Sequence, residues 1–314
     1  MKSTVVYDRA RSCDLPEKVL GDALLRFAYQ SSCGKVLHFG LFAFSLCSRL
    51  LGVYANSSLS RRRIPGTIEE LGIDLSEVEI PEGGFANFND FFTRKLKPGA
   101  RSLPEQAGLL LSPADCRMLV YPELSGGTCI PVKGASFTVA ELLGTKDKAL
   151  ADNFDGGAIC VCRLCPADYH RFHFPADGEM LKTWRQKGKY HSVHPIALRQ
   201  KLRVFSENLR QISLLQLDDF GLASFIEVGA FAVASIQQTF KGDNFKRGQE
   251  KGLFAFGGST IIMIFQAGKV KFSDDLVEKS RENIECLVKM GEEIGCAGGA
   301  VRSAPEARCV VRGA

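Results

Sequence analysis

Short apolar runs recur between glycines and charged turns from about Leu109 onward, and this spacing constrains the fold more than any other feature of the chain. The runs are rich in β-branched and aromatic residues, which favour strands. One of them, AICVCRLCP at 158–166, alternates in the way that a strand does. The spacing therefore predicts a β-rich, mainly antiparallel body with few helices.

The residues before this body have a different pattern. Apolar residues line one helical face between Asp14 and Gln30, and a second helical stretch is indicated at about 34–51. The predicted fold class is therefore α+β, with a helical N-terminal segment followed by the β-rich body. We predict a basic helical segment at 1–65, a catalytic domain at 66–298 and a flexible tail at 299–314.

Positive charge gathers in the N-terminal segment. Residues 1–65 contain ten Lys and Arg and four Asp and Glu, whereas the whole chain has a net charge of +5. The longest apolar stretch, 36–54, is interrupted by polar residues and is shorter than a membrane-spanning helix requires. Lys35 precedes it and Arg61–Arg63 follows it, which fits an interfacial helix beside anionic lipid. A core helix with a solvated basic loop fits equally well, and interleaved aromatics for nucleic-acid binding are absent.

Eleven cysteines, an odd number, are scattered along the chain, and no signal peptide is evident at its start. We therefore expect reduced thiols and a cytosolic location. Cys162 and Cys165 have the spacing of half a metal site, but no second half follows, so a structural role is the simpler interpretation and no metal is predicted.

A Gly-Gly-Ser-Thr sequence interrupts an apolar strand pattern at 253–265. Paired glycines inside a strand mark a bulge or a close backbone approach. The simplest interpretation is a bend between two strands, with Ser259 in the turn. The alternative is that Gly257 and Gly258 clear space for chemistry at Ser259, and four residues do not decide between the two.

Two of the five histidines, His170 and His173, lie three residues apart between prolines. Histidine suits proton transfer near neutral pH, and a structural role is equally compatible with the spacing. His191 and His194 could add metal ligands, but the spacing is not that of a known metal site. Asp115 follows an apolar strand and either caps its own turn or completes an Asp-His-Ser arrangement with Ser259.

Six motifs together resemble the phosphatidylserine decarboxylase family, and the likeness runs from about Val5 to Cys296. In chain order they are FNDFFTRKLKPGAR at 88–101, SPAD at 112–115, PADYHRFHFP at 166–175, IEVGAFAVASI at 226–236, KGLFAFGGSTII at 251–262 and VKMGEEIG at 288–295. Each motif is moderately specific, and six in the family's order are highly specific.

The resemblance implies that the protein cuts its own Gly258–Ser259 bond. In this scheme the Ser259 hydroxyl attacks the Gly258 carbonyl, His173 is the base and Asp115 orients His173. The cut gives a large (β) chain of residues 1–258 and a small (α) chain of 259–314. Ser259 becomes a pyruvoyl group, which is the cofactor.

The resemblance further implies a lyase that converts phosphatidylserine to phosphatidylethanolamine and CO₂ in phospholipid biosynthesis. His170 would assist the decarboxylation step. The cleaved chains would form a heterodimer, and two of these a homodimer. Lipid as substrate favours the interfacial interpretation of the basic segment, so we expect a peripheral protein on the cytoplasmic face of the cell membrane.

Two positions depart from the family pattern: Cys116 replaces the usual glycine after Asp115, and His194 stands where a small or amide residue is expected. Neither removes a catalytic group. Three alternatives stay open, namely a decarboxylase of a soluble amino acid, a membrane-binding relative without activity, and a hydrolase that uses Ser259. The G-x-S-x-G pattern of a nucleophile elbow is absent, which disfavours the third.

Overall fold

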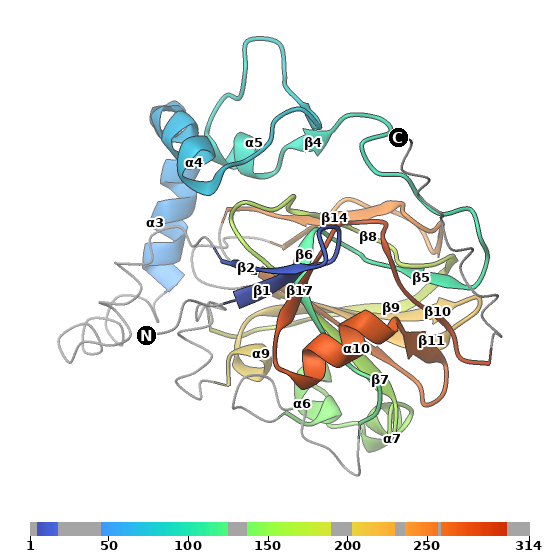
Figure 1. The fold of residues 1–314 in the computed structure, drawn as a ribbon. Helices are drawn as coiled ribbons and strands as arrows, with labels where there is room; N and C mark the ends of the chain where they lie inside the picture. The colour runs from blue at the N-terminus through green and yellow to red at the C-terminus, as the bar shows by residue number, and fades with distance from the viewer. Residues whose placement is uncertain are drawn as a thin grey trace, which may run out of the picture.

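The computed structural model describes residues 5–17, 45–124, 137–189, 203–229, 236–256 and 259–299. Within these ranges the strands form one ten-stranded sheet, two three-stranded sheets and one two-stranded sheet (Figure 1). Neighbouring strands run antiparallel, apart from the first strand of the chain and its partner near the C-terminus. The prediction of a β-rich, mainly antiparallel body is confirmed.

The ten-stranded sheet is the centre of the molecule. Its strands, in spatial order, are β13 (Asn244–Phe245), β9 (Gly178–Gln186), β10 (Arg210–Leu217), β11 (Gly221–Gly229), β15 (Ser259–Phe265), β7 (Ala158–Leu164), β6 (Cys116–Tyr121), β17 (Glu285–Val288), β1 (Val5–Asp8) and β2 (Cys13–Pro16). The three-stranded sheets are β12 (Ile236–Gln238), β14 (Glu250–Phe254) and β8 (Arg171–His173), and β16 (Val270–Phe272), β18 (Glu293–Ala297) and β5 (Leu109–Leu111). The remaining pair is β3 (Val78–Glu79) with β4 (Lys95–Leu96).

Both faces of the ten-stranded sheet are covered. Alternate residues of β15 point to opposite faces, so Ile261 and Met263 belong to one buried cluster and Ile262 and Ile264 to another. The first cluster also contains residues of both three-stranded sheets and of α10 (Asp274–Arg281). The second contains residues of the short helices α6 (Val139–Leu143) and α9 (Val204–Glu207), with α7 (Lys148–Asp152) packed against it. β15 is therefore buried on both sides.

A separate group of helices lies at one side of the sheets (Figure 1). It comprises α3 (Ser45–Ala55), the 3₁₀ helix η2 (Ser58–Arg63), α4 (Ile64–Leu71) and α5 (Phe88–Phe92). Phenylalanines of α5 and of the segment before it form a third buried cluster with α4 and β3. No helix in the described part of the chain is both long enough and apolar enough to cross a membrane.

The start of the chain differs from the expected helix. Residues 5–16 form the hairpin of β1 and β2 at the edge of the large sheet. The Arg9 guanidinium, which follows β1, donates to the Asp275 carboxylate of α10 at 2.6 Å. Such tertiary contacts stabilise strands too short to be seen in the local pattern. Two helical stretches were predicted, at 14–30 and about 34–51, and the parts of them that fall within 18–44 lie outside the described residues, as do residues 300–314 of the predicted tail.

Seven of the cysteines are free thiols: Cys13, Cys116, Cys160, Cys162, Cys165, Cys286 and Cys296. Cys162 lies within β7, as the alternating pattern predicts, and both it and Cys165 are buried. Cys116, one of the departures from the family pattern, is buried at the start of β6, where its sulfur lies 3.9 Å from the Ser112 Oγ.

Candidate active site

Two connections leave the ten-stranded sheet side by side. β7 pairs with β15, and β8 pairs with β14. The segment 165–170 between β7 and β8 therefore runs beside the end of β14 and the residues 255–256 that follow it. The amide of Phe254 donates to the His170 carbonyl at 2.9 Å and holds the two together. The fold thus brings the histidine motif to the serine motif. Gly257 and Gly258 themselves lie outside the described residues.

Ser259 is the first residue of β15, opposite Leu164 of β7 and Gly229 of β11. Its side chain is completely buried, and its Oγ has no hydrogen-bond partner among the described residues. A buried hydroxyl without a partner costs about 1–3 kcal/mol, so such groups are uncommon, and among the described residues Ser224 and Thr260 carry the other two. An unpaired hydroxyl at this position fits a residue that is to be converted into another group.

His170 is also completely buried. Its Nδ1 lies 3.0 Å from the Asp168 carbonyl oxygen, and its ring packs on Phe92 of α5 with ring centres 3.8 Å apart. Burial lowers the pKa of His170 to about 3, so the ring is neutral near pH 7. Because a carbonyl oxygen can only accept, Nδ1 carries the proton and Nε2 the lone pair. Nε2 has no partner among the described residues.

His173 is held at both ring nitrogens. Nδ1 lies 3.0 Å from the Gly248 carbonyl oxygen, and Nε2 lies 3.2 Å from the Tyr169 hydroxyl. Burial lowers the pKa of His173 below its ordinary value of 6.5. The ring is therefore neutral with its proton on Nδ1, which leaves Nε2 as the basic nitrogen.

Asp115 lies close to His173 along the backbone, because the His173 amide donates to the Pro113 carbonyl at 2.8 Å. Among the described residues, the hydrogen-bond partners of the Asp115 carboxylate are groups other than His173. Arg101 Nη2 donates to one oxygen at 2.7 Å, and the amide of Met290 donates to the other at 2.8 Å. The negative charge of Asp115 nevertheless raises the pKa of His173, against the larger effect of burial. That Asp115 orients His173 stays a prediction.

Helix α5 holds the residue before the two glycines. The amide of Phe256 donates to the Asn89 side-chain oxygen at 2.9 Å, and its ring packs edge-on against Phe88 and Phe92. Phe92 in turn packs on His170. The helix therefore fixes both the segment leading to Ser259 and the face of the His170 ring.

These motifs lie within a larger match to known proteins. A comparison with protein-family models matches residues 88–296 to the family described as phosphatidylserine decarboxylase. The chain belongs to this family. The resemblance inferred from the motifs is confirmed, and so is the expected class of enzyme, a decarboxylase made as a proenzyme, at the level of the family.

Curated relatives match the chain over most of its length, and each bears the name phosphatidylserine decarboxylase proenzyme. The relative from Ruminiclostridium cellulolyticum is 40% identical over 92% of this chain and 96% of its own length. Those from Fusobacterium nucleatum and Clostridium botulinum (strain 657) are 38% and 41% identical, each over 89% of this chain and 93% and 94% of their own lengths.

Two arginines that were not singled out from the sequence donate hydrogen bonds to residues of the candidate site of this phosphatidylserine decarboxylase family member. Arg94 donates to the carbonyls of Ala167 and Asp168, at 2.7 and 3.0 Å, and Arg101 binds Asp115. Both arginines belong to the motif at 88–101, whose charged residues in a partly apolar segment were the available signal.

A buried cluster of charges holds the other side of segment 165–170. Arg117 pairs with the Asp168 carboxylate, which also accepts from the Cys165 amide at 2.6 Å. Arg117 and Arg163 both pair with Glu17, at 3.2 and 2.7 Å. The positive charges of these arginines outweigh the effect of burial and lower the pKa of Glu17. The end of the N-terminal hairpin is thereby tied to the segment that leads to His170 and into β8.

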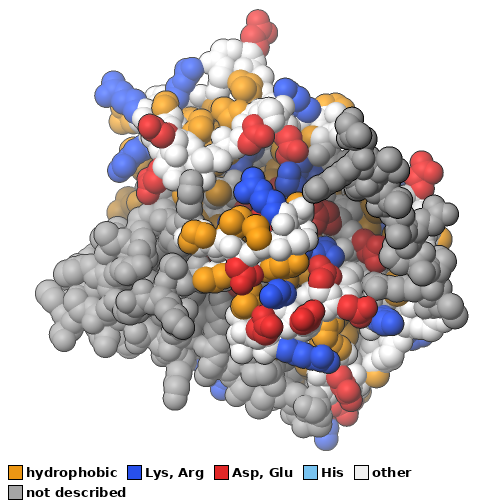
Figure 2. Space-filling model, viewed as in Figure 1, with side chains coloured by type: hydrophobic (Ala, Val, Ile, Leu, Met, Phe, Trp, Pro, Cys, Tyr) orange, Lys and Arg blue, Asp and Glu red, His pale blue; other side chains and the backbone are white. Residues whose placement is uncertain are grey.

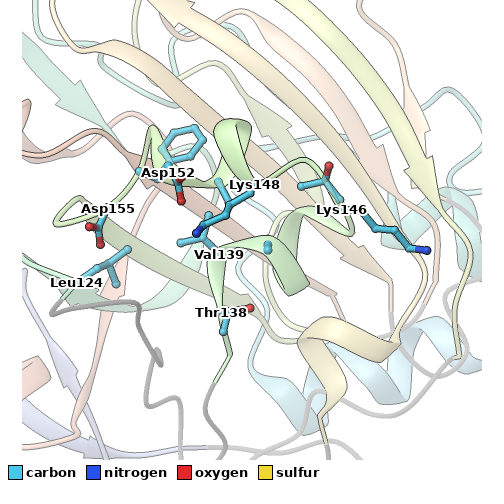
Figure 3. Close-up of a pocket in the computed structure, with 11 residues that line it drawn as sticks. Leu124, Thr138, Val139, Lys146, Lys148, Asp152 and Asp155 are labelled. Carbon is cyan, nitrogen blue, oxygen red and sulfur yellow. The ribbon is translucent and has the colours of Figure 1, made fainter.

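A cavity of about 590 Å³ lies elsewhere, around α6 and α7 (Figure 3). Lys146, Lys148, Asp152 and Asp155 are among the residues that line it, and none of the predicted site residues is. It opens on the face of the ten-stranded sheet opposite the three-stranded sheets. His191 and His194, the other candidate ligands, lie outside the described residues.

Proposed function

We propose that the protein cleaves itself between Gly258 and Ser259 and then decarboxylates phosphatidylserine to phosphatidylethanolamine. Membership of the family supports the reaction. The observation that carries the proposal is the buried Ser259 hydroxyl at the start of β15, which has no hydrogen-bond partner among the described residues and lies beside segment 165–170, which ends at His170. Conversion of Ser259 to a carbonyl would remove a buried O–H donor for which the described residues provide no acceptor.

In the proposed cleavage, the Ser259 Oγ attacks the carbonyl carbon of Gly258 and its proton passes to His173 Nε2. That proton then moves from His173 to the Ser259 nitrogen as the C–N bond of the Gly258–Ser259 amide breaks, which leaves an ester and a free amine. Loss of a proton from the α-carbon of residue 259 then breaks the ester C–O bond, which frees the Gly258 carboxylate and leaves a dehydroalanine. Water converts the dehydroalanine to the pyruvoyl group and releases ammonia. Neutral His173, with its lone pair on Nε2, suits the base in this step.

The pyruvoyl group supplies a carbonyl that condenses with the substrate amine and accepts the electron pair left when CO₂ departs. We propose that His170 assists the loss of CO₂ or the return of a proton to carbon. Its Nε2 has no partner among the described residues, and its ring lies beside the segment that leads to Ser259. Packing against Phe92 would hold that nitrogen in one direction.

After cleavage, the small chain of residues 259–314 would remain bound to the large chain. It begins with β15, which pairs with β11 and β7 on its two sides. It also contains β17, which pairs with β6. A heterodimer of the two chains follows from these pairings, whereas the proposed homodimer rests on the family resemblance alone.

We propose that α3 and η2 contact the lipid surface. The exposed fractions of Leu50, Val53 and Leu59 are 60%, 70% and 64%. Arg61, Arg62 and Arg63 follow at once and are exposed. In Figure 2, hydrophobic and basic side chains lie close together over the part of the molecule that Figure 1 labels α3 and α4. This combination suits a peripheral site on an anionic bilayer, and we place it on the cytoplasmic face.

Intact mass of the purified protein beside a Ser259→Ala variant tests the cleavage. We expect a small chain of 56 of the 314 residues, about 6 kDa, that begins with pyruvoyl and is absent from the variant. A single full-length species in both proteins would contradict the proposal and favour a membrane-binding relative without activity.

Release of CO₂ tests the substrate. The cleaved protein should decarboxylate phosphatidylserine in vesicles and leave free serine and glycerophosphoserine intact. Activity on the soluble compounds alone would favour the alternative of a soluble substrate. Labelling of Ser259 by a serine-directed acylating probe in the purified protein would favour a hydrolase.

A further inference from the structure

We infer that Tyr169 is a positioning residue for His173: its hydroxyl holds the Nε2 nitrogen and, with the Gly248 carbonyl, keeps the ring in the tautomer that leaves Nε2 basic. The inference rests on the proposed self-cleavage, in which Nε2 gives up its hydrogen bond to Tyr169 as it takes the proton of Ser259. It adds a residue to that step and assigns it a role.

The hydrogen bonds around the His173 ring allow one arrangement of protons. The Gly248 carbonyl can only accept, so Nδ1 donates to it across 3.0 Å. Nε2 then has a lone pair and accepts from the Tyr169 hydroxyl across 3.2 Å. A flipped ring would lose both bonds, and a ring protonated at both nitrogens would keep only the bond to the Gly248 carbonyl.

The Tyr169 hydroxyl is well placed to act as a permanent donor. Its side chain is buried, and its ring stacks on the His173 ring at 28°, with ring centres 5.7 Å apart. Burial raises the pKa of Tyr169 above its ordinary value of 10, so the hydroxyl keeps its proton throughout the physiological range.

The backbone on both sides of Tyr169 is held. The preceding carbonyls accept from Arg94, and the following residue, His170, accepts from the Phe254 amide. The hydroxyl is therefore presented to His173 by a rigid segment.

A donor at Nε2 affects the basicity of His173. It stabilises the neutral ring, because the protonated ring would have to give up this bond. Four charged groups act on the same ring or on Tyr169: Glu250 of β14, Asp115, Arg171 of β8 and Arg101. Arg171 pairs with Glu250 at 3.0 Å and Arg101 with Asp115 at 2.7 Å, so these charges balance one another and do not depend on the hydroxyl.

The test measures the rate of self-cleavage against pH for Tyr169→Phe, which deletes the hydroxyl and keeps the stacked ring. Precursor is made by pulse-labelled cell-free translation, translation is stopped, and the small chain is followed on gels at a series of pH values. Cleavage needs neutral His173, so its rate rises with pH through the pKa of this residue. Loss of one hydrogen bond should move this rise upward by about one pH unit.

Tyr121→Phe is the matched control. Tyr121 is another partly buried tyrosine, which packs against the cluster on the opposite face of the sheet, and its variant should cleave as the parent does. If the cleavage rate of Tyr169→Phe rises over the same pH range as that of the parent, the inference is overturned, whatever the rate reached at high pH. Parent protein that does not cleave at all would instead overturn the proposed function.

A second measurement does not require the Tyr169 variant to fold. In the uncleaved Ser259→Ala protein, ¹⁵N chemical shifts of the His173 ring, assigned by comparison with His173→Asn, report which nitrogen carries the proton. We expect the proton on Nδ1. A proton on Nε2 would overturn the inference, because the Tyr169 hydroxyl could not then donate to that nitrogen.

Discussion

Burial decides the charge of both candidate histidines, His170 and His173. His170 is fully buried, and its pKa falls to about 3, while the pKa of His173 is lowered by the same cause. The sequence predicted both histidines as candidates from their motif. It could not show their protonation, because that depends on residues far away in the chain, such as Phe92 and Gly248, that the fold packs against them.

The lowered pKa of His170 predicts a loss of stability in acid. In the unfolded chain the residue takes up a proton near pH 6.5, and in the folded protein it does not until about pH 3. Its contribution is therefore fully present above pH 6.5 and is lost as the pH falls below that value, by up to about 1.4 kcal/mol per pH unit. Urea unfolding of the uncleaved Ser259→Ala protein at pH 7, 6 and 5 measures this.

In the Ser259→Ala background, His170→Gln should reduce the pH dependence of the free energy of unfolding by about one proton between pH 6 and 5. An identical slope in the two proteins would show that His170 is accessible to protons in the folded state. His173 stays in place in both proteins, so its own contribution cancels in the comparison.

Strands were predicted where local pattern and tertiary environment agree. The alternating or apolar runs at β7 and β15 identified those strands, and both are buried on each face. The order of strands was not predictable, because periodicity shows which residues face a core and not which strand lies next. β1 and β2 were missed, since four-residue strands with charged residues between them depend on partners such as Asp275.

Strand β14 carries a charged side chain, Lys251, into the buried interior of the protein. Lys251 and Glu227 of β11 are both completely buried, and their charged groups lie 2.6 Å apart, with Gln238 of β12 accepting a second bond at 2.8 Å. Their carboxylate and ammonium groups compensate each other. Removing one partner leaves the other buried and unpaired, which costs much more than removing both.

We therefore expect Lys251→Met in the Ser259→Ala background to lower the free energy of unfolding by about 3–5 kcal/mol. The double variant with Glu227→Leu should recover most of that loss. Urea denaturation of the two variants and the parent gives the comparison. Equal losses in the single and double variants would mean that the pair does not act as a unit.

At the scale of the whole molecule, the exposed apolar and basic residues of α3 and η2 lie on the helical side and not over the sheets (Figure 1). The sequence predicted an interfacial role for this region from its charge, and left a buried helix equally open. Exposure of Leu50 and Val53 favours the first. The segment 18–44, which contains the rest of the predicted helix, lies outside the described residues.

Replacing Arg61, Arg62 and Arg63 by glutamine should weaken binding to vesicles that contain phosphatidylserine. Each basic residue near an anionic surface contributes about 1 kcal/mol, so the triple variant should bind about a hundredfold less tightly at low salt. Sedimentation with vesicles measures this. The control replaces Lys146, Lys148 and Lys269, which are exposed elsewhere, and should bind as the parent does. Equal affinity of the two triple variants would place the lipid contact away from η2.

The position of β15 limits how long one molecule of the protein can remain active. This strand lies between β11 and β7, in the interior of the ten-stranded sheet, and in the proposed cleavage it begins the small chain. Withdrawing it would break two rows of backbone hydrogen bonds at once, so one molecule cannot take a fresh small chain from another without unfolding. A cofactor that is made once from the backbone then has no route of replacement. Chemical damage to this cofactor would inactivate the molecule permanently, and activity would return only with synthesis of a new chain.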